Sequence, residues 1–257
     1  DFSIFKNELS VEDVNNLRST IDMLSRYRGL PTNAWLEEII SNLEYRFGIK
    51  PNSENLISFE QNDQLKGLEN LSGLIDAVMN HTTLSVHYKT YKGVEFIHTI
   101  YPYYIKEYNN RWFLFGMGEE VGDVENLALD RIVEYSISNK SFKPNVTTDF
   151  STYFDDVIGV SKPKSDVKVE NIKLRFTDNR FPYVLSKPLH HTQTIVEGES
   201  NTIQIEVRPT RELDQIIFSF IPDIEVLSPD WYRASITEKI KENLEKRVEF
   251  FKKNKRA

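Results

Sequence analysis

The sequence of 257 residues contains no cysteine, only ten glycines and ten prolines, and no long apolar run. The absence of cysteine excludes a disulfide framework, a thiolate zinc site and a cysteine nucleophile. Every apolar run is shorter than the roughly 18–20 residues of a membrane-spanning helix, so we expect no membrane partner. The low glycine and proline content, with 39% hydrophobic and 28% charged residues, is typical of a folded globular chain.

The formal net charge is −7, and the acidic excess is concentrated in the first 80 residues. Because a protein that wraps duplex DNA needs a basic face, this charge argues against such binding by these residues. The length suggests two domains at roughly 100–200 residues per domain. The chain begins at Asp1 without a methionine or an apolar leader. We therefore expect a fragment of a longer cytoplasmic protein.

The first third has a helical pattern. Apolar residues recur three and four positions apart from Val11 to Leu24 and from Trp35 to Phe47, which places them on one face of each helix. The second of these helices carries more acidic than basic residues, which is unfavourable for a DNA recognition helix. We therefore interpret residues 1–65 as a helical linker or dimerisation segment.

After a further helical pattern over residues 65–79, the apolar period changes to two. Leu84, Val86 and Tyr88 alternate with polar residues, as in a half-buried strand. Further strands are predicted at residues 95–105 and 111–116 and from residue 126, with short turns between them. Short strands at this spacing indicate a small, strongly bent sheet or barrel.

Residues 143–169, which contain Pro144 and Pro163, are predicted to be a linker. Beyond them the patterns predict strands at 171–176, 192–196, 202–207 and 224–227, and helices at 180–186, 212–220 and 231–251. The order β-α-β-β-α-β, followed by a long final helix, is that of ferredoxin-like modules. The predicted fold class is α+β, divided into residues 1–65, 66–142, 143–169 and 170–257.

The sequence contains no recognisable catalytic motif. A nucleophile elbow, a P-loop and a His-Glu-x-x-His pattern are absent, and the glycines at 116–122 have the wrong spacing for a dinucleotide site. His190 and His191 are adjacent, and neighbours on a strand point to opposite faces, which is unfavourable for sharing one metal ion. We therefore expect no enzymatic activity, no cofactor and no metal.

Four short motifs follow one another between residues 84 and 132. They are Leu-Ser-Val-His-Tyr-Lys at 84–89, Ile-Tyr-Pro-Tyr-Tyr-Ile at 100–105, Arg-Trp-Phe-Leu at 111–114 and Leu-Ala-Leu-Asp-Arg-Ile at 127–132. In this order and spacing they closely resemble the WYL domain of bacterial transcriptional regulators, which is named for a Trp-Tyr-Leu triplet. Residues 170–257 resemble the C-terminal extension of that family, and the front helices resemble the segment that joins its winged helix-turn-helix to the WYL domain.

The resemblance implies an Sm-like (SH3-like) β-barrel at residues 66–142. In this family such a domain is thought to bind a nucleic-acid or nucleotide-type effector and so to modulate DNA binding by a winged helix-turn-helix, here expected before Asp1. It also implies a homodimer, with single-stranded nucleic acid or a nucleotide as effector and duplex DNA bound through the preceding domain. The implied ligand-binding residues are three aromatic ones for base stacking and three polar ones. They are Tyr88, Tyr103 and Trp112, with Lys89, His98 and Arg131.

Two departures from the family pattern leave a second hypothesis open. His98 stands where many members have an arginine, and Leu127-Ala128 stands where they have Phe-Arg. Without these cations the domain would suit a smaller ligand, or it would be a structural dimerisation scaffold that senses nothing. Trp112 and Tyr88 are also plausible core residues, because aromatic side chains tend to pack.

Overall fold

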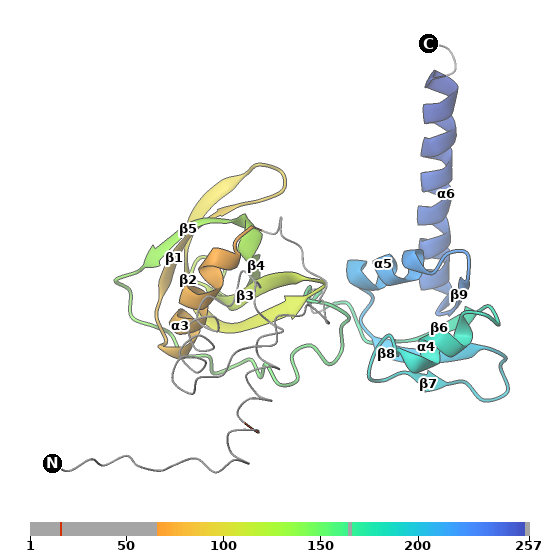
Figure 1. Cartoon of the computed structure of the whole chain (residues 1–257), viewed down its shortest axis with the longest axis horizontal. Coiled ribbons are helices and arrows are strands. Elements are labelled where there is room, and N and C mark those ends of the chain that lie inside the picture. Colours follow the sequence, from red (N-terminus) through yellow and green to blue (C-terminus); the bar gives the residue numbers. More distant parts are fainter. Residues whose placement is uncertain (1–15, 17–65, 164–165, 255–257) are drawn as a thin grey trace. The chain divides into compact units, whose positions relative to one another are not determined.

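The computed structural model of this chain describes residues 16, 66–163 and 166–254. The two helices expected between residues 11 and 47, and with them the segment 1–65, lie outside the described residues. The chain forms two compact units that divide between Asn145 and Val146, and each is described by itself (Figure 1). Among the helices of the described residues, none combines the length and apolar composition that crossing a membrane requires.

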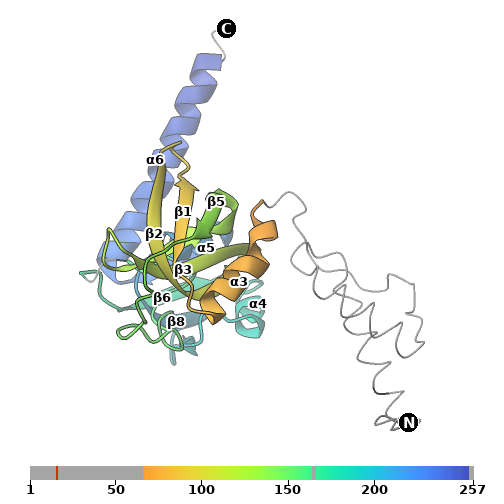
Figure 2. The same cartoon turned by 90° about the vertical axis from the view of Figure 1, so that its left-hand side faces the viewer.

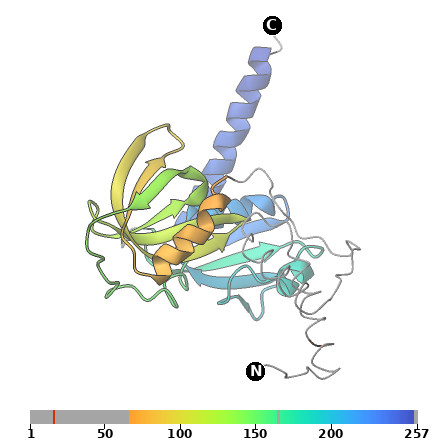
Figure 3. The same cartoon turned by 60° about the vertical axis from the view of Figure 1, so that its left-hand side comes forward.

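The first unit is a five-stranded antiparallel sheet with a short helix packed on one face (Figures 1 and 3). The strands lie in the order β4-β3-β2-β1-β5, and β5 runs beside β1 (Figure 2). The elements are η1 (Leu68–Asn70), α3 (Leu71–Met79), β1 (Leu84–Lys89), β2 (Glu95–Tyr108), β3 (Arg111–Gly118), β4 (Val124–Ala128), η2 (Leu129–Arg131) and β5 (Ile132–Ile137).

Burial in this unit follows the periods read from the sequence. In β1 the side chains of Leu84, Val86 and Tyr88 are buried and those between them are more exposed, so the predicted period of two is confirmed. Leu71 and Leu74 of α3 belong to the same core cluster, because residues three apart share one face of a helix. The core of the unit therefore lies between α3 and one face of the sheet.

The strand predicted from residue 126 does not continue through the motif at residues 127–132. β4 ends at Ala128, the short helix η2 follows, and β5 begins at Ile132. Leu127, Ala128 and Leu129 are all buried, and the chain turns at η2. Among the described residues no ladder joins β4 to β5 directly, and the sheet is therefore open rather than a closed barrel.

The second unit is a four-stranded antiparallel sheet with three helices. Its strand order is β7-β8-β6-β9. Buried residues from the sheet, from both shorter helices and from the start of the long helix form one core cluster, and that helix extends beyond the rest of its unit (Figure 1). The elements are β6 (Glu170–Phe176), α4 (Phe181–Ser186), β7 (Thr194–Ile195), β8 (Thr202–Val207), α5 (Arg211–Ser219), β9 (Ile224–Ser228) and α6 (Asp230–Asn254). The predicted order of elements and the α+β class are confirmed.

Part of the segment predicted as a linker is built into the second unit. Ile158 is buried and belongs to the core cluster of that unit. Arg208 Nε donates to Asp156 Oδ2 at 2.5 Å, and the backbone N–H of Arg208 donates to the carbonyl oxygen of Asp156 at 2.7 Å. Residues 156–160 are therefore packed onto the second unit.

His190 and His191 do not lie on a strand, contrary to the premise of the sequence argument. They lie in the turns between α4 and β7, and their ring centroids are 4.2 Å apart. Within the described part of the chain, no group of three or more histidine or acidic side chains has the arrangement needed to hold a metal ion.

Candidate functional site

A cavity of about 460 Å³ opens at the end of β1 in the first unit. Three separated segments line it, because η1, the β1–β2 turn and η2 meet at this end of the sheet. The lining comprises Lys66, Gly67, Glu69, Lys89, Thr90, Tyr91, Asp130, Arg131, Ile132 and Val133. The cavity thus brings together cationic, acidic and aromatic side chains that lie far apart in the sequence.

Among the cations that line this cavity, Arg131 is distinguished by a close contact with an aromatic ring and by the lack of an ion pair in the described residues. Its guanidinium carbon lies 3.2 Å from the centroid of the Tyr91 ring, which is a close cation–π contact. Its Nε is buried and has no hydrogen-bond partner in the described residues. No carboxylate oxygen of those residues lies within 4.0 Å of its guanidinium nitrogens, so an ion pair does not neutralise it.

Asp130, the neighbour of Arg131, is instead paired with Arg111. The Arg111 Nη2 and Asp130 Oδ2 atoms are 2.5 Å apart, and the carboxylate is largely buried. Arg111 also donates from Nη1 to the hydroxyl of Tyr91. Although Asp130 directly precedes Arg131 in the sequence, its carboxylate pairs with Arg111 at the start of β3.

Tyr88 does not line the cavity, but it binds the chain segment next to it. Its ring is buried in the core cluster, and its hydroxyl accepts a hydrogen bond of 3.2 Å from the backbone N–H of Ala128. Burial raises the pKa of the Tyr88 hydroxyl, and the nearby charge of Arg131 opposes this only in part. Tyr88 therefore anchors the chain just before η2, the element that carries Arg131.

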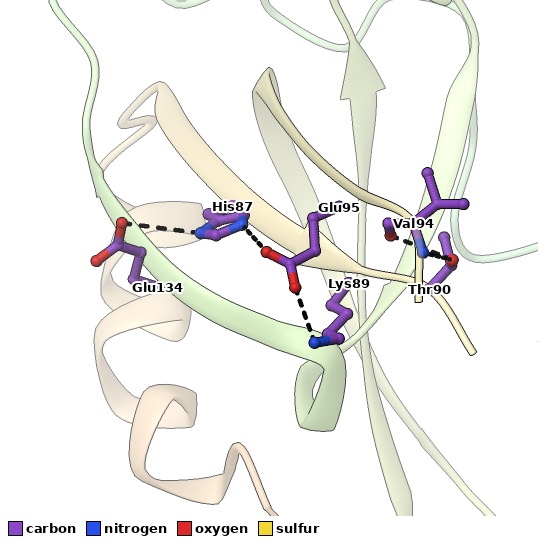
Figure 4. A network of polar contacts seen from close by, with 6 residues as sticks. All are labelled: His87, Lys89, Thr90, Val94, Glu95 and Glu134. Carbon is purple, nitrogen blue, oxygen red and sulfur yellow. Dashed lines mark hydrogen bonds and ion pairs between the residues drawn. The ribbon is translucent and has the colours of Figure 1, made fainter. Parts of the chain in front are cut away.

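Lys89 lies at the cavity, but a carboxylate already shares its charge. Its Nζ is 2.8 Å from Glu95 Oε1, and Glu95 Oε2 is 3.0 Å from His87 Nε2. Glu134 on β5 approaches the other ring nitrogen of His87 at 3.9 Å, so this network crosses three strands (Figure 4). The hydrogen bond from Lys89, and then that from His87, lower the pKa of the Glu95 carboxyl. Glu95 is therefore ionised at neutral pH and competes with any anionic ligand for Lys89.

The other three predicted site residues lie away from the cavity. His98 is buried, with its Nδ1 atom 3.6 Å from Glu125 Oε2. Tyr103 donates its hydroxyl to the carbonyl oxygen of Lys143 at 2.9 Å. Trp112 packs, partly buried, against the core cluster. The structure thus places Lys89 and Arg131 at the cavity. Tyr88 does not line it but binds the backbone just before η2, and His98, Tyr103 and Trp112 lie elsewhere in the first unit.

The sequence patterns do not single out Tyr91 or Arg111 as site residues. Tyr91 belongs to a predicted turn, and Arg111 begins a predicted strand. A large aromatic residue at the tip of a tight turn was the one available signal, because such positions usually carry small or polar residues. Nothing local in the sequence connects Tyr91 with Arg111 twenty positions later.

Comparison with known proteins finds two domains in this chain. Residues 69–137 match the WYL domain, and residues 168–244 match the WCX domain. No curated protein matches the chain. The solved structure of proteasome accessory factor B/C (PafBC) of Arthrobacter aurescens is 14% identical, covering 87% of this chain and 34% of that chain, with a TM-score of 0.31.

A solved structure described as a CRISPR Cas-related protein is also 14% identical. It covers 95% of this chain and 76% of that chain, with a TM-score of 0.45. The chain spans about a third of the length of PafBC. The resemblance drawn from the four motifs is confirmed at the level of the domain, and this chain carries a WYL domain followed by a WCX domain.

Proposed function

We propose that this chain is the effector-sensing region of a transcriptional regulator, and that the cavity at Arg131 binds a nucleotide or the end of a single-stranded nucleic acid. One observation carries the proposal: Arg131 lines the cavity, its Nε is buried without a partner in the described residues, and no carboxylate there neutralises it. The match to the WYL domain supports a regulatory sensing role.

The chemistry of the lining favours a phosphate-bearing ligand. A guanidinium group binds phosphate with two parallel hydrogen bonds, and it gains most where water is partly excluded. Lys66 and Lys89 add positive charge at the same cavity. Its volume of about 460 Å³ is in the range of small-molecule sites, and suits one nucleotide rather than a long strand.

The proposal extends to the architecture around the cavity. We propose that the open sheet of the first unit is an Sm-like fold, in which η2 links the two edge strands. The strand order β7-β8-β6-β9 supports a ferredoxin-like arrangement for the second unit. We further propose a cytoplasmic homodimer without catalytic activity, whose DNA contacts come from a winged helix-turn-helix outside this chain.

Fluorescence anisotropy with short labelled single strands of DNA and RNA, a duplex control and a salt series tests the site. We expect saturable single-strand binding, weakened about tenfold or more by Arg131→Gln, because a hydrogen bond to a charged group is lost. The slope of log K against log salt should fall by roughly 0.7, which corresponds to one phosphate contact on a single strand. Arg233→Gln, which removes the same charge from the exposed start of α6, is the matched control. Equal affinities of both variants would refute the role of Arg131.

A structural dimerisation scaffold is the second candidate. The ion pair of Lys89 with Glu95 and the acidic Glu69 and Asp130 at the cavity favour it, because they reduce the positive charge available to an anion. This candidate predicts a stable dimer that binds neither single strands nor nucleotides. Calorimetric titration with nucleotides, together with light scattering to measure the mass in solution, separates the two functions.

A further inference from the structure

Tyr91 occupies an unusual position for an aromatic residue. It lies in the tight turn between β1 and β2, and 70% of its surface is exposed. The Arg131 guanidinium covers its ring at 3.2 Å, and Arg111 donates to its hydroxyl. Arg111 is in turn held by Asp130. Two arginines thus orient a side chain that would otherwise rotate freely in solvent.

The turn itself does not require this aromatic ring. Two hydrogen bonds between Thr90 and Val94 close the turn. The backbone N–H of Thr90 donates to the carbonyl oxygen of Val94 at 2.8 Å. The backbone N–H of Val94 donates to the Thr90 hydroxyl oxygen, Oγ1, at 3.1 Å (Figure 4). Gly93 provides the left-handed backbone with φ of +79°. Tyr91 lies outside the core cluster of this unit. Its orientation therefore needs an explanation other than folding of the hairpin.

We propose that Tyr91 is the residue that makes this site selective for ligands with a planar aromatic group, such as a nucleobase. The inference rests on the function proposed above for the cavity at Arg131. With a guanidinium against one face and most of its surface exposed, the ring has room for a base on its other face. Arg111 and Asp130 are positioning residues, because they fix the ring without lying against the base.

This arrangement divides recognition between two groups. Arg131 and the lysines at the cavity attract the phosphate, which carries no information about the base. Tyr91 adds a stacking contact that only an aromatic ligand can make, and because every base has a flat face the contact discriminates little among bases. The site should therefore distinguish a nucleotide from a sugar phosphate more strongly than one nucleotide from another.

Calorimetric titration of the whole chain with the four 5′-ribonucleoside monophosphates and with ribose 5-phosphate tests the inference. We expect the nucleotides to bind about 5- to 150-fold more tightly than ribose 5-phosphate, the range for stacking on one aromatic side chain. Tyr91→Leu should remove most of this preference, measured as the ratio of the affinity for a nucleotide to that for ribose 5-phosphate. The ratio is the readout because loss of the ring also removes the cation–π contact with Arg131 and so changes the affinity for the phosphate group itself. Tyr91→Phe should keep most of the preference, because the ring remains.

Tyr183→Leu is the matched control. Tyr183 is also an exposed tyrosine with an arginine over its ring, but it lies on α4 in the second unit. That variant should bind every probe as the natural chain does. An equal loss of affinity for all five probes in Tyr91→Leu, which keeps the preference for nucleotides, would instead indicate a structural role and would overturn the inference.

The remaining outcomes separate the two proposals. If the natural chain binds ribose 5-phosphate as tightly as nucleotides, or if Tyr91→Leu keeps the preference, the anion site stands and the role of Tyr91 is refuted. If the natural chain binds none of the five probes, the proposed cavity function fails and the inference fails with it.

Discussion

Replacement of Gly67 by alanine should destabilise the first unit and disturb the cavity. Gly67 precedes η1 with φ of +86°, and a Cβ atom there would lie 2.2 Å from the carbonyl oxygen of Leu129. The left-handed backbone costs an L-residue about 1–2 kcal/mol, and overpacking typically costs about 1–3 kcal/mol more. Gly67→Ala is therefore expected to lower the free energy of unfolding of this unit by roughly 2–5 kcal/mol.

Gly93→Ala separates the two contributions. Gly93 has φ of +79°, but no atom lies within 4 Å of where its Cβ would be. This variant should lose only the backbone contribution of about 1–2 kcal/mol. The difference between the variants then measures how closely Gly67 approaches η2, the element that carries Arg131.

Urea unfolding followed by the fluorescence of Trp112 provides the measurement, in a background where Trp35 and Trp231 are replaced by phenylalanine. Trp112 packs against the core of the first unit, so its emission reports on that unit. Equal destabilisation by the two alanine variants would refute the close approach of Gly67 to η2. Folded Gly67→Ala protein should also bind nucleotides more weakly, because Leu129 must move and Arg131 follows it in the same turn.

Three further predictions concern charge, hydrogen bonding and pH. Glu95→Gln should release Lys89 and so raise the affinity for inorganic phosphate about 1.5- to 5-fold, the range for an exposed ion pair. Calorimetry that shows no gain in affinity would contradict competition by Glu95. Tyr103→Phe should cost about 0.5–1.5 kcal/mol of stability through the lost hydrogen bond to Lys143, whereas a loss of nucleotide affinity would place Tyr103 in the site. Burial lowers the pKa of His190 below 6.5, so the unfolded state binds more protons just below that pH. The stability of the second unit should therefore fall as the pH is lowered through about 6.5 in urea unfolding, and an unchanged slope in His190→Gln would rule out this origin.

Much of the fold was predictable because its elements depend on local patterns. The alternation in β1 and the order of strands and helices after residue 170 follow from side-chain period and from turn residues. The turn at η2 was missed, because Leu127 to Ile132 is an apolar-rich run that reads as one strand. In the structure the chain leaves β4 after Ala128 and turns through η2, where Leu129 joins the core cluster that α3 and the sheet form.

The candidate site was predictable only in part. Lys89 and Arg131 were identified through the resemblance to the WYL domain, and the structure places both at one cavity. As ligand contacts, all six residues stay predictions. The four that do not line this cavity are Tyr88, His98, Tyr103 and Trp112. Periodicity indicates which side chains face inwards, but it does not tell which strand ends meet.

The sequence by itself determined the periods of the elements, their order and the identity of the WYL domain. Tertiary structure alone decided that Tyr91, Arg111 and Arg131 meet, because these residues come from a turn, the start of a strand and a short helix. Antiparallel pairing of β1 with β2 and of β2 with β3 sets their registers, and the turn at η2 returns the chain to the same end of the sheet. Such a meeting depends on pairing between distant segments, whereas local patterns reflect only neighbouring residues.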